Sequence, residues 1–265
     1  MKRFFAALLV LLITFSMSAC TKTKEHQLVD ANGAVKGYVK ETLETMNEYC
    51  TKLEFMDANK NITHTMEATE EGLYYRWSIF DDAISRQTPL MNKRDFSMAG
   101  VVYIDVWNSA KKSMEGKEYY TFPCSGKIME EYELKENGKG EIFYTSAKCY
   151  NEDGSVKWSY TPKFGTYLIF GIMGGVDVSY VYVEELDDAG NEACHTYYNR
   201  ETLAFEYAKR EVYTDASTQA PTYIYWYNED FSVRYSEENI FDSEGYINDT
   251  ILYDANGNIL DAIPE

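Results

Sequence analysis

The sequence is poor in proline, histidine and basic residues. Its 265 residues include 5 prolines, 3 histidines and 25 Lys plus Arg, against 43 Asp plus Glu. The resulting formal net charge of −18 argues against nucleic-acid binding, because clusters of Lys and Arg bind phosphate backbones. The same charge disfavours a globule that lies flat on anionic lipid headgroups. We therefore expect no nucleic-acid partner.

Motifs for catalysis and metal binding are also missing. The histidines are His26, His64 and His195, and no HExxH, GxSxG or paired Cys–His spacing occurs. His195 follows Cys194, but adjacent strand residues point to opposite faces, which suits a Cys–His dyad poorly. Among 43 acidic residues carboxylate pairs arise by chance, so a two-carboxylate glycan hydrolase is neither supported nor excluded. We predict a non-catalytic protein without catalytic residues, metal or cofactor.

Long hydrophobic runs are confined to the N-terminus. Lys2 and Arg3 precede an apolar run over residues 4–15 that only Thr14 interrupts, and small residues then lead to Cys20. A membrane-spanning helix needs about 20 apolar residues, so this run is too short to be one. A basic start, a short apolar run and small residues at the end are typical of an export signal.

The end of this signal, Ser-Met-Ser-Ala-Cys at residues 16–20, resembles the lipobox of bacterial lipoproteins, although Met17 replaces the usual leucine. In that class the cysteine is diacylated and becomes the new N-terminus. The resemblance implies a signal peptide over residues 1–19 and a lipid anchor on Cys20, because two acyl chains attach a protein durably. It also implies export and attachment at the bacterial cell membrane or envelope surface. The alternative is an ordinary secretory signal that is cut nearby.

Four further cysteines remain after Cys20, and they are Cys50, Cys124, Cys149 and Cys194. An even number outside the cytoplasm permits two disulfides in any of three connectivities. Buried thiols are the other interpretation. No CxxC pair occurs, which disfavours a zinc site or thioredoxin-like chemistry.

One turn pattern recurs along the chain: an apolar residue, Asp or Asn, two variable residues, Gly, one more residue and an apolar residue. Copies occupy residues 29–35, 150–156, 241–247 and 253–259, with lysine at the glycine position in 56–62 and a shortened relative at 187–191. Asp or Asn caps the amides of a type I turn, and glycine in the fourth position adopts the left-handed conformation of a hairpin bulge. An EF-hand loop has its glycine at the sixth position, so the pattern favours β-hairpins over calcium loops.

Segments between the turns alternate in period two, as in residues 73–79, 180–183 and 223–227. Such alternation of aromatic and β-branched residues is typical of antiparallel strands. Residues 38–49 fit a helix or a strand, and residues 162–173 fit a buried strand or a short helix. We predict a mainly β fold, an antiparallel meander of hairpins that forms an incomplete barrel or strongly curved sheet with few helices. Its expected organisation is a lipidated tether over 20–37 and a single β-rich domain over 38–265.

An aromatic-rich meander behind an acylated cysteine resembles the LolA/LppX-like lipoproteins, and residues 198–206 are similar to a late-strand pattern of that class. The resemblance implies an incomplete barrel over an apolar cavity that holds a lipid or other lipophilic ligand. The ligand-binding residues expected on this basis are Trp77, Phe143, Leu168, Phe170, Ile172 and Trp226.

The leading functional hypothesis is therefore a non-catalytic envelope lipoprotein whose β-domain binds an apolar ligand. A second hypothesis starts from the closely spaced hairpins at 241–247 and 253–259, which resemble YD-type or MORN-like β-repeat proteins. That resemblance implies a surface interaction or adhesion module whose exposed tyrosines bind protein or glycan.

Overall fold

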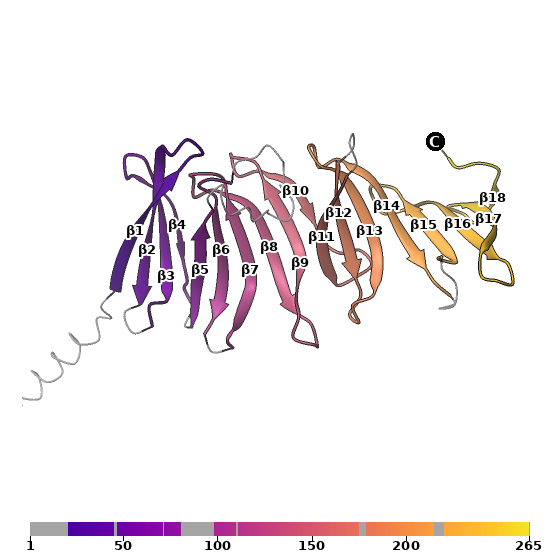
Figure 1. The fold of residues 1–265 in the computed structure, drawn as a ribbon, viewed down its shortest axis with the longest axis horizontal. Coiled ribbons are helices and arrows are strands. Elements are labelled where there is room, and N and C mark those ends of the chain that lie inside the picture. Colours follow the sequence, from indigo (N-terminus) through magenta and orange to yellow (C-terminus); the bar gives the residue numbers. More distant parts are fainter. Residues whose placement is uncertain are drawn as a thin grey trace, which may run out of the picture. The chain divides into compact units, whose positions relative to one another are not determined.

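A computed structural model of the chain describes residues 21–44, 47–70, 72–80, 98–109, 111–174, 179–214 and 220–264. Every regular element in these ranges is a β-strand, and the strands belong to one antiparallel sheet that is not closed into a barrel (Figure 1). The predicted fold class, a mainly β meander of hairpins, is confirmed. The chain divides into two compact units, which differs from the single domain expected for residues 38–265.

The first unit comprises residues 1–86, 97–131 and 150–155. In it β1 pairs with β2, β2 with β3, β3 with both β4 and β5, β5 with β6, and β6 with β7. Its strands are β1 (Thr21–Val29), β2 (Val35–Glu44), β3 (Cys50–Asp57), β4 (Ile62–Glu67), β5 (Leu73–Ile79), β6 (Val102–Asn108), β7 (Ser113–Thr121) and the first part of β8 (Ile128–Glu136).

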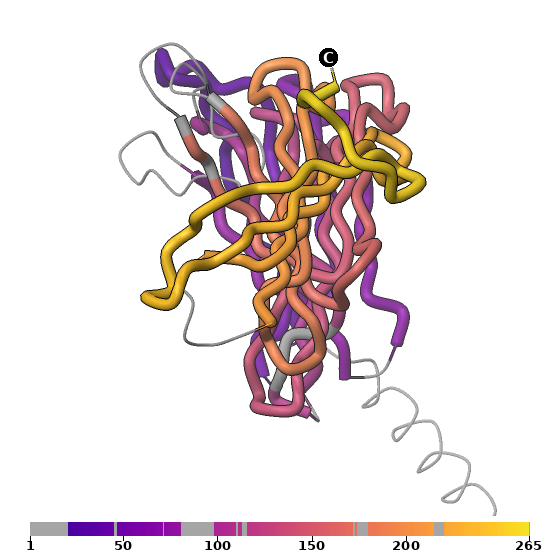
Figure 2. The backbone as a smooth tube through the Cα atoms, turned by 90° about the vertical axis from the view of Figure 1, so that its right-hand side faces the viewer, coloured from indigo at the N-terminus to yellow at the C-terminus, as the bar shows by residue number. Residues whose placement is uncertain are grey.

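The second unit comprises residues 87–96, 132–149 and 156–265. From β11 to β18 each strand pairs with the next one in the chain, and β11 also contacts β9. In Figure 2 the orange and yellow parts of the backbone follow this back-and-forth course. Its strands after β8 are β9 (Ile142–Tyr150), β10 (Val156–Tyr160), β11 (Tyr167–Gly174), β12 (Ser179–Leu186), β13 (Glu192–Asn199), β14 (Phe205–Val212), β15 (Tyr223–Tyr227), β16 (Val233–Phe241), β17 (Ile247–Asp254) and β18 (Ile259–Leu260).

The predicted turns are hairpin turns with the expected hydrogen bonds. In each glycine copy the amide of the glycine donates to the carbonyl of the Asp or Asn that opens the turn. The glycines have φ between 77° and 89°, and they are Gly33, Gly154, Gly190, Gly245 and Gly257. Lys60 takes the same position with φ 66° and donates to Asp57 at 3.0 Å. Asx capping and a left-handed fourth residue therefore fix the register of these hairpins.

The segment from residue 21 belongs to the sheet, which corrects the tether expected over residues 20–37. Residues 21–29 form β1 and pair with β2, from Thr21 opposite Glu44 to Val29 opposite Val35. The turn copy at 29–35 is the physical reason, because a hairpin turn requires a strand on both sides. Cys20 and the signal peptide expected over residues 1–19 lie outside the described residues.

Each unit buries apolar side chains on one face of its strands. In the first unit Val39 and Leu43 of β2 lie in a cluster with Leu53 and Phe55 of β3 and are at most 3% exposed. In the second unit Leu168 and Val183 form a cluster with Tyr160 and Tyr198. Both ambiguous segments contribute strands, because 38–44 lies in β2 and 167–173 lies in β11. Within the described ranges there is no helix of the length and apolarity that a membrane crossing requires.

Candidate functional site

The six residues expected to bind a lipophilic ligand fall in both compact units. Trp77 belongs to the first unit, where it packs against the core and its indole Nε1 donates to Glu41 at 3.1 Å. The other five belong to the second unit. There Leu168 is a core residue and Phe170 packs against the same cluster.

The remaining three residues of that set lie apart from this cluster. Phe143 contacts Tyr167, and Trp226 stacks on Tyr235 with its indole Nε1 donating to Glu237 at 2.7 Å. Ile172 lies on β11 opposite Val181, and its side chain is outside the described part of the structure.

The four described cysteines are thiols and no disulfide joins them. Burial raises the pKa of Cys50 and Cys194 to about 12, so both stay protonated at neutral pH. Cys194 lies in the core at 2% exposure, whereas its neighbour His195 is half-buried on the other face of the strand. The alternation expected from the sequence therefore separates the two side chains, and they form no dyad.

An aromatic pocket of about 320 Å³ opens in the second unit, at one end of its strands. We name it by its lining residues, which are Trp158, Ser159, Tyr160, Thr161, Lys163, Tyr198, Leu203, Phe205, Glu229, Asp230 and Phe231. They come from β10 and the loop behind it, from β13, β14 and the turn between them, and from the turn between β15 and β16. The lining thus combines aromatic side chains with carboxylates and an ammonium group.

Two of these turns hold a bulky residue in the left-handed conformation, Phe231 at the glycine position of the recurring pattern and Leu203 in a turn that is one residue longer. Phe231 has φ 62° and its amide donates to Asn228 at 2.9 Å, while Leu203 has φ 57° and its amide donates to Asn199 at 2.8 Å. A left-handed conformation costs a bulky residue about 1–3 kcal/mol and persists only where the surroundings compensate. Here the side chains compensate, because Leu203 is 6% exposed and Phe231 packs against several rings.

A fully buried carboxylate stabilises the wall of the pocket. Glu185 is 0% exposed, and its Oε1 accepts a hydrogen bond from the Tyr160 hydroxyl at 2.6 Å. Its Oε2 accepts from the backbone amides of Lys163, Phe164 and Gly165 at 2.9, 2.7 and 2.8 Å. Burial and the neighbouring Glu185 carboxylate raise the pKa of Tyr160, so this phenol stays protonated and donates. These bonds fix the loop that carries Lys163 into the pocket.

The charged groups at the pocket are exposed. Lys163, Glu229 and Asp230 are each exposed to solvent, and the Lys163 Nζ lies 5.8 Å from the centre of the Phe231 ring. The Ser232 hydroxyl and amide lower the pKa of Asp230, which is therefore ionised at neutral pH. The pocket can accordingly contact a flat apolar face with its rings and hydroxyl groups with its carboxylates.

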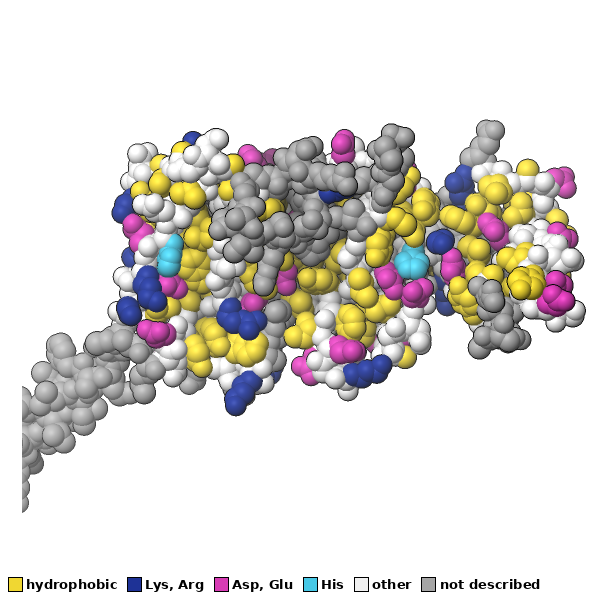
Figure 3. Space-filling model, viewed as in Figure 1, with side chains coloured by type: hydrophobic (Ala, Val, Ile, Leu, Met, Phe, Trp, Pro, Cys, Tyr) yellow, Lys and Arg dark blue, Asp and Glu magenta, His cyan; other side chains and the backbone are white. Residues whose placement is uncertain are grey.

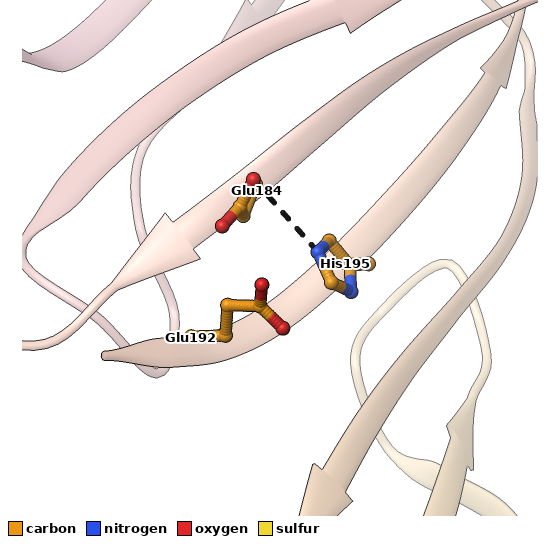
Figure 4. A group of neighbouring side chains, drawn as sticks. All are labelled: Glu184, Glu192 and His195. Carbon is orange, nitrogen blue, oxygen red and sulfur yellow. Dashed lines mark ion pairs between the residues drawn. The ribbon is translucent and has the colours of Figure 1, made fainter. Parts of the chain in front are cut away.

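A second group of functional side chains lies on the hairpin of β12 and β13. Glu184 Oε2 is 3.9 Å from His195 Nε2, and the carboxylate of Glu192 points towards the same space (Figure 4). Burial raises the pKa of the Glu184 carboxyl. The neighbouring His195 lowers this pKa, and the carboxylate of Glu192 raises it. This group borders a cavity of about 260 Å³ whose lining includes Glu192, His195, Glu211 and Tyr213.

Sequence reasoning missed both groups. The signal for the pocket was the turn 228–232, which matches the recurring pattern with Phe231 in place of glycine. For the acidic–histidine group the sequence carried no comparable signal, since residues three apart on a regular strand face opposite sides. On the face seen in Figure 3, hydrophobic side chains are spread over the described part of the molecule, with acidic and basic side chains scattered among them.

Comparison with known proteins yields no functional assignment. No protein-family model matches the chain, and no curated protein matches it. Among solved structures it is similar to a protein of unknown function from Bacteroides caccae, with 8% sequence identity and a TM-score of 0.24. That similarity covers 85% of this chain and 76% of the other.

Proposed function

We propose that the protein is a non-catalytic envelope lipoprotein whose aromatic pocket binds a ring-shaped, hydroxylated ligand such as a sugar unit of a glycan. The observation that carries this proposal is the lining of the pocket, in which Trp158, Phe205 and Phe231 lie beside Lys163 and Glu229. Pockets of roughly 300–1,000 Å³ that combine aromatic walls with a few polar groups are typical small-ligand sites. The site supports the interaction-module hypothesis best.

The chemistry of the lining favours a sugar over an acyl chain. The C–H faces of a sugar ring pack on aromatic rings, and its hydroxyl groups donate to carboxylates. An acyl chain would offer no hydrogen bond to the Glu229 and Asp230 carboxylates or to the Lys163 ammonium that line the pocket. None of the six residues first expected to bind a lipid is among the described lining of this pocket.

Anchoring at Cys20 completes the proposal. The acyl chains would hold the protein at the membrane, and the acidic net charge of −18 would keep the globule off anionic headgroups. Metabolic labelling with a fatty-acid analogue tests this step. Label is expected in the wild type and absent in Cys20→Ser, and equal labelling of both would contradict the anchor.

A glycan array probed with the purified protein tests the pocket, followed by calorimetric titration of the glycan that binds. Trp158→Ala and Glu229→Gln are each expected to weaken binding at least about tenfold, because both side chains line the pocket. Trp226→Ala and Glu206→Gln are matched controls in the same unit but outside the pocket, and they should bind as the wild type does. Absence of any bound glycan, or equal losses in variants and controls, would refute the proposal.

A further inference from the structure

Glu184, Glu192 and His195 each place one ligand atom within 4.8 Å of the others. From this arrangement we infer that the β12–β13 hairpin binds a divalent transition-metal ion, for which Zn²⁺ is the appropriate probe. This inference departs from the absence of a metal expected from the sequence. It is independent of the glycan-binding proposal, because the aromatic pocket takes its β13 residue, Tyr198, from the other end of that strand.

A β-bulge explains why these residues converge. Glu184 and His195 are direct cross-strand partners, so their side chains lie on the same face of the sheet. Further along, Glu185 pairs with Cys194 but Leu186 pairs with Glu192, which leaves Ala193 as an extra residue. The extra residue shifts the alternation of β13, and Glu192 therefore joins His195 on one face although the two are three positions apart.

The distances fit a single ion. Zinc bonds to imidazole nitrogen and carboxylate oxygen are about 2.0–2.2 Å long, so two ligands of one ion lie at most about 4.4 Å apart. The 3.9 Å between Glu184 Oε2 and His195 Nε2 satisfies this limit without any movement. Glu192 is exposed, and a small rotation of its side chain brings its oxygen into range.

The donor set selects the class of metal. One imidazole with two carboxylates suits Zn²⁺ and its first-row neighbours, whereas Ca²⁺ takes six to eight oxygen ligands. Cys194 is excluded as a ligand, because its sulfur lies in the core on the opposite face. The cavity beside Glu192 and His195 leaves room for water to complete the coordination.

The charges around the site favour a cation. Glu184 and Glu192 lie beside His195, Glu211 is close enough to interact with it electrostatically, and Lys209 is its partner on the neighbouring strand β14. Lys209 Nζ is 2.6 Å from Glu211 Oε1, so its charge is matched by that carboxylate. Lys209 therefore does not balance the negative charges of Glu184 and Glu192, and a bound divalent cation would neutralise them.

Calorimetric titration of the purified, chelator-treated protein with Zn²⁺ tests the inference. One ion per chain is expected to bind, and His195→Ala and Glu192→Gln should each weaken binding more than about tenfold. Glu192 is exposed, so its replacement should leave the circular-dichroism spectrum unchanged. Ca²⁺ should bind at least about tenfold more weakly than Zn²⁺.

His26→Ala is the matched control, because His26 Nε2 also lies beside a carboxylate, 3.1 Å from Glu41 Oε1, but in the first unit and outside the proposed group. It should bind Zn²⁺ as the wild type does. The inference is overturned if no ion binds, if the two site variants retain wild-type affinity, or if His26→Ala loses as much affinity as His195→Ala.

Discussion

The β15–β16 turn and the β17–β18 turn share one hydrogen-bond pattern and differ in the residue at the fourth position. In the first, Asn228 and Ser232 close the turn around Phe231 at φ 62°, and in the second, Asp254 and Asn258 close it around Gly257 at φ 84°. Gly257 has nothing within 4 Å of the position of a Cβ, whereas Phe231 packs against the rings of the pocket. A left-handed residue can thus be bulky where its side chain finds a partner, and those partners here form the candidate binding site.

Replacing Glu185, the buried carboxylate in the wall of the pocket, should cause the largest loss of stability. Glu185→Ala leaves the backbone amides at 163–165 without their acceptor, while the Tyr160 hydroxyl keeps only Thr196 Oγ1, 3.0 Å away, as a partner. Each unpaired buried donor costs about 1–3 kcal/mol, so we expect unfolding free energy to fall by about 4 kcal/mol in urea titrations. Glu184→Ala, the adjacent half-buried residue, should cost less than about 1 kcal/mol. Equal losses would show that Glu185 does not support the pocket.

Two substitutions at Phe231 separate packing from backbone strain. Phe231→Ala and Phe231→Gly both lose aromatic packing, about 2 kcal/mol for a half-buried ring. Glycine also recovers about 1 kcal/mol of left-handed strain that alanine keeps. The glycine variant should therefore be the more stable of the two in urea unfolding, the reverse of their usual order in a strand. An alanine variant at least as stable as the glycine variant would contradict the left-handed strain.

Substitutions of Gly257 test whether packing against neighbouring rings is what allows a bulky residue at this turn position. Gly257→Ala should cost about 1 kcal/mol, because its φ of 84° is unfavourable for any residue with a Cβ. Gly257→Phe should cost about as much as alanine does, since open space surrounds the position and no ring lies there to compensate. The same urea titrations measure both, and a phenylalanine variant as stable as the wild type would break the comparison.

Local chemistry in the sequence predicted the β-fold well but not the sites. The Asp–Gly turns and the alternation at 73–79 and 223–227 depend on neighbouring residues alone, and β5 and β15 have those bounds. The pocket depends on Tyr160, Glu185 and Phe231, which lie far apart in the chain and meet only in the folded sheet. The group around His195 depends on a bulge, and one extra residue opposite Glu185 leaves no mark in composition or spacing.

Acid should weaken the hydrogen bonds of both turns slightly. The titrating carboxyl is Asp254, the first turn residue, in the β17–β18 turn and Asp230, the third, in the β15–β16 turn. The Asn258 side chain and the amides of Asn258 and Asn256 lower the pKa of Asp254, and the Ser232 hydroxyl and amide lower that of Asp230. A carboxyl with a lowered pKa stabilises the fold above its unfolded pKa, and this contribution is lost as pH falls through the folded value, below the usual 3.8. NMR titration should therefore show the Asn258 and Ser232 amides shifting only in that acidic range. Asp254→Asn should remove the shift at Asn258 and leave Ser232 unchanged, because an asparagine amide oxygen accepts the two backbone bonds of Oδ1 without titrating. A persistent Asn258 shift would identify another titrating group.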